Sequence, residues 1–141
     1  MMTILEEVKE MFATELRSEA FIDYNHCEEC ADHNETLKKY DRNAIPLEEL
    51  NNPGWYPICF VTPEAFRYLF PRLCELAYGV GNEYYLGQFL FHLENHVDLL
   101  TKAEKDKVYE LLVDIYSQNS VEIDANFDKP DIDRVSERLT T

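Results

Sequence analysis

Apolar residues recur along this chain at the three- and four-residue spacing that is typical of amphipathic α-helices. The spacing predicts helices over residues 3–20, 25–40, 62–78, 83–97, 101–117 and 130–139, with one further helical turn over 46–50. We therefore expect an all-α or nearly all-α fold. Five or six helices should form one compact domain over residues 1–141, because a chain of this length corresponds to a single domain.

Several of these helices begin with recognisable capping residues. Two capping boxes are present: Thr3 with Glu6, and Thr101 with Glu104. In such a box the Thr hydroxyl and the Glu carboxylate each accept a hydrogen bond from the other residue's main-chain N–H. Thr62 is the expected N-cap of the third helix, because Pro63 follows it at the first helical position. Pro71 lies inside the same helix, so we expect a kink there or a split into two helices.

Other stretches set the limits of the helical pattern. The first helix is expected to bury an apolar stripe of Leu5, Val8, Phe12 and Leu16. Residues 53–61 contain two prolines and the only tryptophan, which predicts an irregular buried segment, with or without a short strand. We interpret its aromatic side chains as core rather than as a ligand pocket. Residues 118–130 are polar and predict a turn-rich connection.

The stretch from His26 to His33 carries the candidate chemistry of the chain. Cys27 and Cys30 form a C-x2-C pair, a spacing at which two thiolates can bind one Zn²⁺, and His33 follows three residues later. In a helix His26, Cys30 and His33 would project along one stripe. The candidate zinc ligands are therefore Cys27, Cys30, His33 and His26. Three of them would need one remote ligand, for which the chain offers two further cysteines: Cys59 and Cys74.

Two other interpretations of this stretch stay open. A zinc ribbon or finger would carry a second Cys or His pair further along the chain, and the sequence has none. A C-x2-C pair at the start of a helix is also typical of redox sites, although Glu28 and Glu29 between the cysteines disfavour a thiolate. The third interpretation is ordinary core packing on one buried helical stripe, made of Cys30, His33 (or Asn34), Leu37 and Tyr40.

A second pair of histidines, His92 and His96, has the i, i+4 spacing of metal ligands on a helix. Glu94 lies between them, one position away from the place it takes in the His-Glu-x-x-His pattern of zinc proteases. We therefore expect surface or capping histidines here rather than a metal site.

The charge of the chain is strongly acidic and unevenly distributed. The formal net charge is −15, from 28 acidic and 13 basic residues. Residues 1–35 alone carry ten acids against Lys9 and Arg17, a net of −8. Such a field repels phosphates, so it argues against a nucleic-acid partner and favours a basic protein surface; solubility alone is the other explanation.

The sequence carries neither a basic, apolar leader at its start nor an apolar stretch long enough to span a membrane. We therefore expect a cytoplasmic protein with no membrane partner. Its four cysteines should then stay reduced.

Two stretches together resemble a family of small, uncharacterised bacterial proteins. The first is H-C-E-E-C-A-D-H-N-E-T-L over residues 26–37. The second is P-G-W-Y-P-I-C-F-V-T-P-E-A-F-R-Y over residues 53–68, with residues 85–93 behind it. The resemblance covers about residues 20–115 and implies a bacterial or phage-like source and a single helical domain. It implies no activity and no substrate.

These observations favour a non-catalytic protein-interaction or regulatory domain. It would bind a basic partner, as toxin-neutralising immunity proteins do. The alternative is a zinc-binding domain that uses Cys27, Cys30 and His33, either structurally or for hydrolysis. No catalytic residue is singled out, because the G-x-S-x-G, P-loop and dinucleotide-binding patterns are all absent. The only cofactor that the pattern suggests is Zn²⁺, and the pattern predicts no oligomeric state.

Overall fold

The computed structural model describes residues 2–17, 35, 37–50, 61–79 and 84–140. Within these residues the chain forms six α-helices and two short 3-10 helices, and no strand. The α-helices are α1 (Ile4–Met11), α3 (Leu47–Leu50), α4 (Pro63–Tyr78), α5 (Leu86–His96), α6 (Lys102–Ala125) and α7 (Lys129–Leu139). The 3-10 helices are η1 (Arg42–Ala44) and η3 (Val97–Leu99). The expected all-α fold is thereby confirmed.

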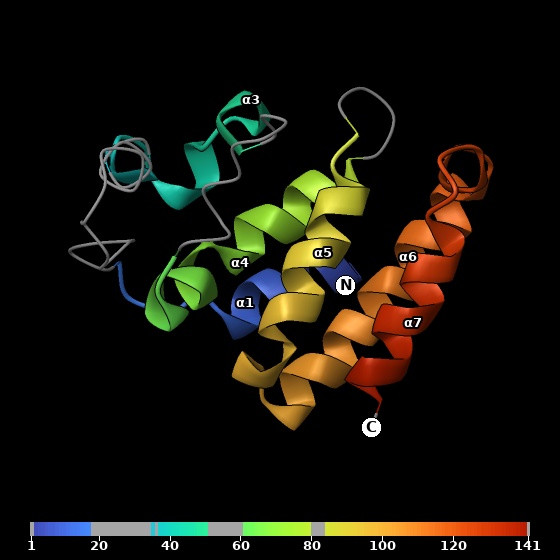
Figure 1. Cartoon of the computed structure of the whole chain (residues 1–141). Helices are drawn as coiled ribbons and strands as arrows, with labels where there is room; N and C mark the ends of the chain where they lie inside the picture. The colour runs from blue at the N-terminus through green and yellow to red at the C-terminus, as the bar shows by residue number, and fades with distance from the viewer. Residues whose placement is uncertain (1, 18–34, 36, 51–60, 80–83, 141) are drawn as a thin grey trace.

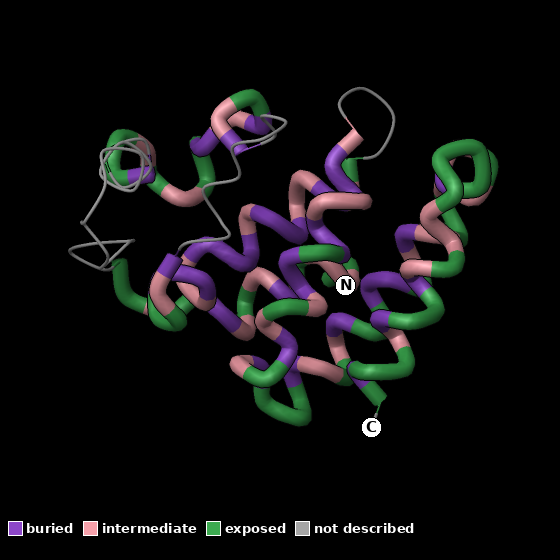
Figure 2. The backbone as a smooth tube through the Cα atoms, in the orientation of Figure 1, coloured by how far each residue is buried: buried purple, intermediate pink, exposed green. Residues whose placement is uncertain are grey.

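The helices pack around one apolar centre (Figure 1). α4 packs against both α1 and α5, and α1 also packs against α6. α6 and α7 form a helical hairpin, and the inner side of α7 packs against α5. The hairpin therefore forms one side of the molecule, with the inner faces of both helices covered. Figure 2 shows buried positions repeating along the inner side of α4, α5, α6 and α7.

The predicted capping residues begin the helices as expected. The Thr3 hydroxyl accepts from the Glu6 N–H at 3.1 Å, and the reciprocal bond to the Glu6 carboxylate is also present. The box at the start of α6 is formed in the same way, with the Glu104 N–H donating to the Thr101 hydroxyl at 3.2 Å. Thr62 caps α4 by accepting from the Ala65 N–H. Each cap satisfies N–H groups that have no partner inside the helix.

α4 runs through Pro71 as one helix, so of the kink or split expected there, the split is wrong and the kink stays a prediction. Pro71 is itself buried, together with Phe70 and Leu73 on either side of it. Burial of these side chains stabilises the helical path more than the loss of one main-chain hydrogen bond destabilises it.

The two largest differences from the predicted boundaries are at the ends of α1 and α6. α1 ends at Met11, so Leu16 leaves the expected stripe and is 84% exposed. α6 continues to Ala125, where a turn-rich connection was expected, and bends at Asn119 (φ −132°, ψ 28°). The Asn119 side chain donates to the Ile115 carbonyl at 3.1 Å, which takes the place of a helical hydrogen bond at the bend. Helical structure then resumes because Ile123 returns to the core.

Four phenylalanine rings form the centre of the core. Phe70 of α4 lies 5.1 Å from Phe12, 5.4 Å from Phe66 and 5.9 Å from Phe89, measured between ring centroids. All four side chains are fully buried. The cluster joins the end of α1, the middle of α4 and the start of α5. The α6–α7 hairpin packs against two of these helices, α1 and α5.

Candidate functional site

The predicted zinc ligands His26, Cys27, Cys30 and His33 lie outside the described residues, as do Cys59 and most of the predicted 25–40 helix. The irregular segment expected over 53–61 does too, apart from Val61, which is buried. The zinc, redox and core interpretations of the Cys/His stretch all stay predictions.

Cys74 is the one cysteine whose surroundings are described. It lies on the buried face of α4 within the apolar core, with no exposed surface. Burial raises the pKa of the Cys74 thiol well above its ordinary value, because the thiolate is not solvated there. A neutral, buried thiol behaves as a small apolar side chain. Within the described part of the chain, no group of His, Cys, Asp or Glu side chains could hold a metal ion.

The two histidines of α5 are arranged differently from each other, and the expected surface position is wrong for His92. His92 is buried on the inner side of α5, whereas its neighbour Phe91 faces outward. His96 stacks on Phe66 with ring centroids 4.2 Å apart, and its Nδ1 lies 2.7 Å from the His92 main-chain carbonyl. His96 therefore closes the end of α5 in a capping role.

Burial of His92 gives the fold a pH dependence. Burial, with a smaller contribution from the nearby His96, lowers the pKa of His92 from 6.5 to about 4. The unfolded chain therefore binds more protons than the folded chain between these values, and stability falls as the pH falls through this window.

Between about pH 7 and about pH 5, His92 should lower the unfolding free energy of the unaltered chain by about 2 kcal/mol. We expect His92→Leu to abolish this part of the pH dependence. Urea denaturation of both proteins at the two pH values measures this difference. Carboxylates contribute equally to both proteins, so they cancel in the comparison. An unchanged pH dependence in the variant would show that His92 keeps its ordinary pKa in the fold.

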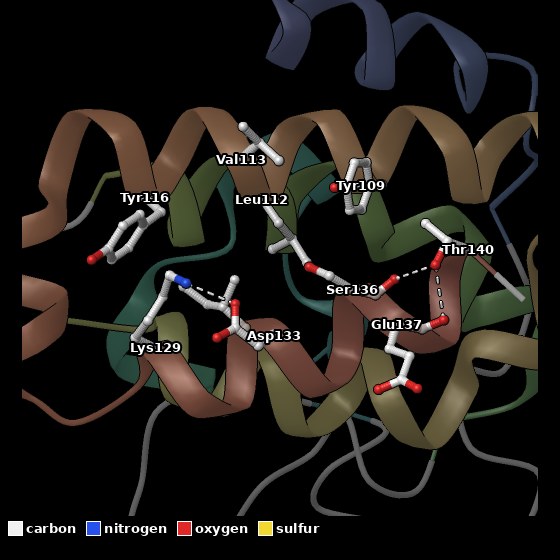
Figure 3. A pocket seen from close by; sticks show the side chains of 10 residues that line it. Tyr109, Leu112, Val113, Tyr116, Lys129, Asp133, Ser136, Glu137 and Thr140 are labelled. Carbon is white, nitrogen blue, oxygen red and sulfur yellow. Dashed lines mark hydrogen bonds and ion pairs between the residues drawn. The ribbon is translucent and has the colours of Figure 1, made fainter.

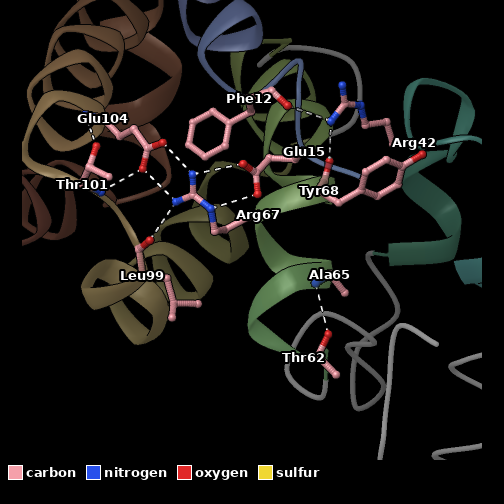
Figure 4. A network of polar contacts seen from close by, with 10 residues as sticks. All are labelled: Phe12, Glu15, Arg42, Thr62, Ala65, Arg67, Tyr68, Leu99, Thr101 and Glu104. Carbon is pink, nitrogen blue, oxygen red and sulfur yellow. Dashed lines mark hydrogen bonds and ion pairs between the residues drawn. The ribbon is translucent and has the colours of Figure 1, made fainter. Parts of the chain in front are cut away.

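A polar cluster around Arg67 ties three parts of the fold together (Figure 4). Arg67 of α4 forms a forked pair with Glu104 of α6, with N–O distances of 2.8 and 2.7 Å. Its Nε donates to Glu15 at 3.0 Å, and its Nη1 also donates to the Leu99 carbonyl at 2.8 Å. Burial disfavours the charged form of Glu104, but the hydrogen bonds from Arg67 outweigh this effect and hold the pKa of Glu104 below its usual value. Every donor is used within the fold, so the cluster has a structural role.

A groove lies between α6 and α7 (Figure 3). Its volume is about 550 Å³, and Leu112 and Ile132, both buried, lie at its base. Tyr109 and Val113 of α6 line it from above and remain exposed, at 38% and 52%. Three more residues line the α7 side and are polar: Ser136, Glu137 and Thr140. The groove is thus apolar along α6 and polar along α7.

At one end of the groove the charges are already paired. Lys129 forms an ion pair with Asp133 at 2.8 Å, and its ammonium lies 4.8 Å from the centre of the Tyr116 ring. The Tyr116 hydroxyl donates to Asp124, which raises the pKa of Tyr116. Lys129 is the only basic residue in the lining, and its charge is offset by Asp133. Glu137 leaves the groove with a net negative charge.

Most of the basic side chains of the chain are likewise engaged within the fold. Every Lys and Arg of the sequence lies in the described part. Ion pairs with carboxylates engage Lys9, Arg67, Arg72, Lys102, Lys107, Lys129 and Arg134. Main-chain carbonyls accept hydrogen bonds from Arg17, Arg42 and Arg138. The net charge of −15 is therefore carried by carboxylates in excess of these internal pairs.

Comparisons with protein-family models, with curated proteins and with solved structures find no match to this chain. The resemblance to a bacterial family therefore stays a prediction. No helix among the described residues is both long enough and apolar enough to cross a membrane.

Proposed function

We propose that this chain is a non-catalytic protein-interaction domain that binds a basic protein. The observation that carries the proposal is that the fold itself engages most of the Lys and Arg side chains. Most Lys and Arg side chains are paired with carboxylates or main-chain carbonyls of the same chain, so the excess of acids is what the surface presents to other molecules. A field of this sign speeds encounter with positively charged surfaces and slows encounter with nucleic acids.

The test is affinity capture from an extract of cells that make the protein. The immobilised chain is compared with immobilised polyglutamate that carries the same total negative charge. We expect the chain to retain a small set of basic proteins that polyglutamate does not retain, and raised salt to release them at constant pH. Retention of the same proteins by both matrices would reduce the effect to ion exchange and contradict the proposal, as would retention that salt does not change.

The zinc-binding alternative rests on Cys27, Cys30, His33 and His26 alone. Elemental mass spectrometry of protein purified without a His tag tests it directly. About one zinc per chain, with thiols that react only after chelation, would support a metal site. The absence of metal together with freely reacting or inert thiols would support the other two interpretations of this stretch.

A further inference from the structure

The turn between α6 and α7 holds a phenylalanine in a backbone conformation that ordinarily belongs to glycine. Phe127 has φ 60°, the only positive φ among the described non-glycine residues. Its N–H donates to the Asp124 carbonyl at 3.1 Å, and the Asp128 N–H donates to the Ile123 carbonyl at 3.2 Å. These two bonds form a Schellman motif, in which the residue at the Phe127 position is left-handed. Glycine is the usual residue there because it has no Cβ to clash.

Burial of the Phe127 side chain does not compensate for this backbone strain. The side chain is 84% exposed, so it contributes little to the core. An exposed aromatic side chain held in a strained backbone conformation is a mark of a functional position rather than a structural one. Six residues earlier, on α6, Val121 is exposed to the same extent. The tip of the hairpin thus presents two apolar side chains that folding does not require.

The groove begins immediately beyond this turn. Lys129, two residues after Phe127, lines one end of the groove, and Thr140 lines the other. At the helical rise this stretch of α7 is about 16 Å long, which matches about three turns of a helix lying alongside it. Exposed Tyr109 and Val113 provide apolar contacts one helical turn apart on α6. Grooves of this kind bind an amphipathic helix through side chains at i, i+3 or i+4, and i+7.

Charge decides which helix fits. A second copy of this chain would bring another net charge of −15 to the same surface, so like-charge repulsion opposes self-association through the groove. The lining contributes the carboxylates of Asp133 and Glu137 against the single, already paired Lys129. Basic residues beside an apolar stripe would complement this lining.

We propose that the α6–α7 groove binds an amphipathic helix of a partner protein, with an apolar stripe flanked by Lys or Arg, and that Phe127 packs against this helix. The inference rests on the proposed function and adds the surface and the form of the partner. The apolar stripe lies along Tyr109 and Val113, and the basic flank faces the α7 carboxylates.

Three synthetic helical peptides of about three turns serve as probes. The first carries a Leu/Trp stripe flanked by Lys, the second has the same stripe flanked by Glu, and the third has the composition of the first with the stripe scrambled. Binding to the ¹⁵N-labelled chain is followed by NMR. We expect the first peptide to shift the amide signals of residues 109–116 and 127–140, and to bind at least about tenfold more tightly than either of the others.

Two variants and a control separate binding from folding. Phe127→Gly should raise the melting temperature by about 3 °C, because the backbone strain is relieved, yet weaken binding of the first peptide about tenfold. Val113→Asp should abolish the localised shifts and leave the melting temperature nearly unchanged, since the side chain is exposed. Phe91→Ala, an exposed aromatic residue of α5, should leave binding unchanged.

The outcomes distinguish this inference from the proposed function. Shifts confined to another face, or equal binding of the scrambled peptide, would overturn the groove as the binding site, while salt-dependent capture of basic proteins would still stand. An affinity unchanged by Phe127→Gly would remove Phe127 from the contact. Failure of the capture experiment would instead overturn the proposed function itself.

Discussion

Replacing Phe70 by alanine is expected to lower the free energy of unfolding by about 4 kcal/mol. The Phe70 ring is fully buried and contacts three other rings, Phe12, Phe66 and Phe89, at centroid distances between 5.1 and 5.9 Å. Its removal takes away both apolar burial and these ring contacts, and α1, α4 and α5 meet at the cavity that it leaves. A loss of this size is a large fraction of the stability of an ordinary domain.

Urea denaturation followed by circular dichroism measures the loss. Phe91→Ala is the matched control, because Phe91 is 53% exposed and faces away from the core. We expect the control to change the unfolding free energy by less than about 1 kcal/mol. Equal losses in the two variants would mean that the four-ring cluster is not the centre of the fold.

The second large effect is expected at Arg67. Arg67→Met should lower the free energy of unfolding by about 3 kcal/mol. The reason is that the variant would leave the Glu104 carboxylate buried without a cation beside it. Glu104 is 6% exposed and faces Arg67 through two charge-assisted hydrogen bonds, and Glu15 binds the same guanidinium. Without the cation, the buried Glu104 carboxylate would face the Glu15 carboxylate, whose side chain is 27% exposed, with no positive charge between them.

A paired experiment separates this effect from surface electrostatics. Arg134→Met removes a similar forked pair with Glu94, but the Arg134 side chain is 54% exposed. We expect that variant to lose less than about 1 kcal/mol. The double variant Arg67→Met/Glu104→Gln should be more stable than Arg67→Met alone, because no buried charge is then left unpaired. A double variant at least as unstable as the sum of both single changes would contradict this account.

Local signals predicted the helices well, because caps and apolar stripes depend on residues close in sequence. Thr3, Thr62 and Thr101 each cap the helix that the sequence assigned to them. The second half of α6 was not predicted, because its polar residues resemble a connection and only Ile123 reaches the core. The bend at Asn119 hides the continuity further by interrupting the apolar spacing.

The candidate site was hidden for a different reason. The groove exists only because α6 and α7 lie side by side, and no local pattern specifies that contact. Val113 offered one signal, as an apolar residue outside the buried stripe of α6. The turn that ends α6 also lacks the glycine that usually marks it, since Phe127 occupies that position. Burial of His92 likewise depends on the packing of α5 against its neighbours.

The central claim is that the acidic surface of the chain binds a basic protein. Its most direct test is calorimetry, over a range of salt concentrations, of the affinity of the chain for its captured basic partner. We predict a dissociation constant that weakens at least about tenfold between about 0.05 M and about 0.5 M salt, because screening removes the attraction to the unpaired carboxylates. Val113→Asp should weaken binding at every salt concentration. A dissociation constant that does not change with salt would contradict the account, since the acidic surface would then play no part in recognition.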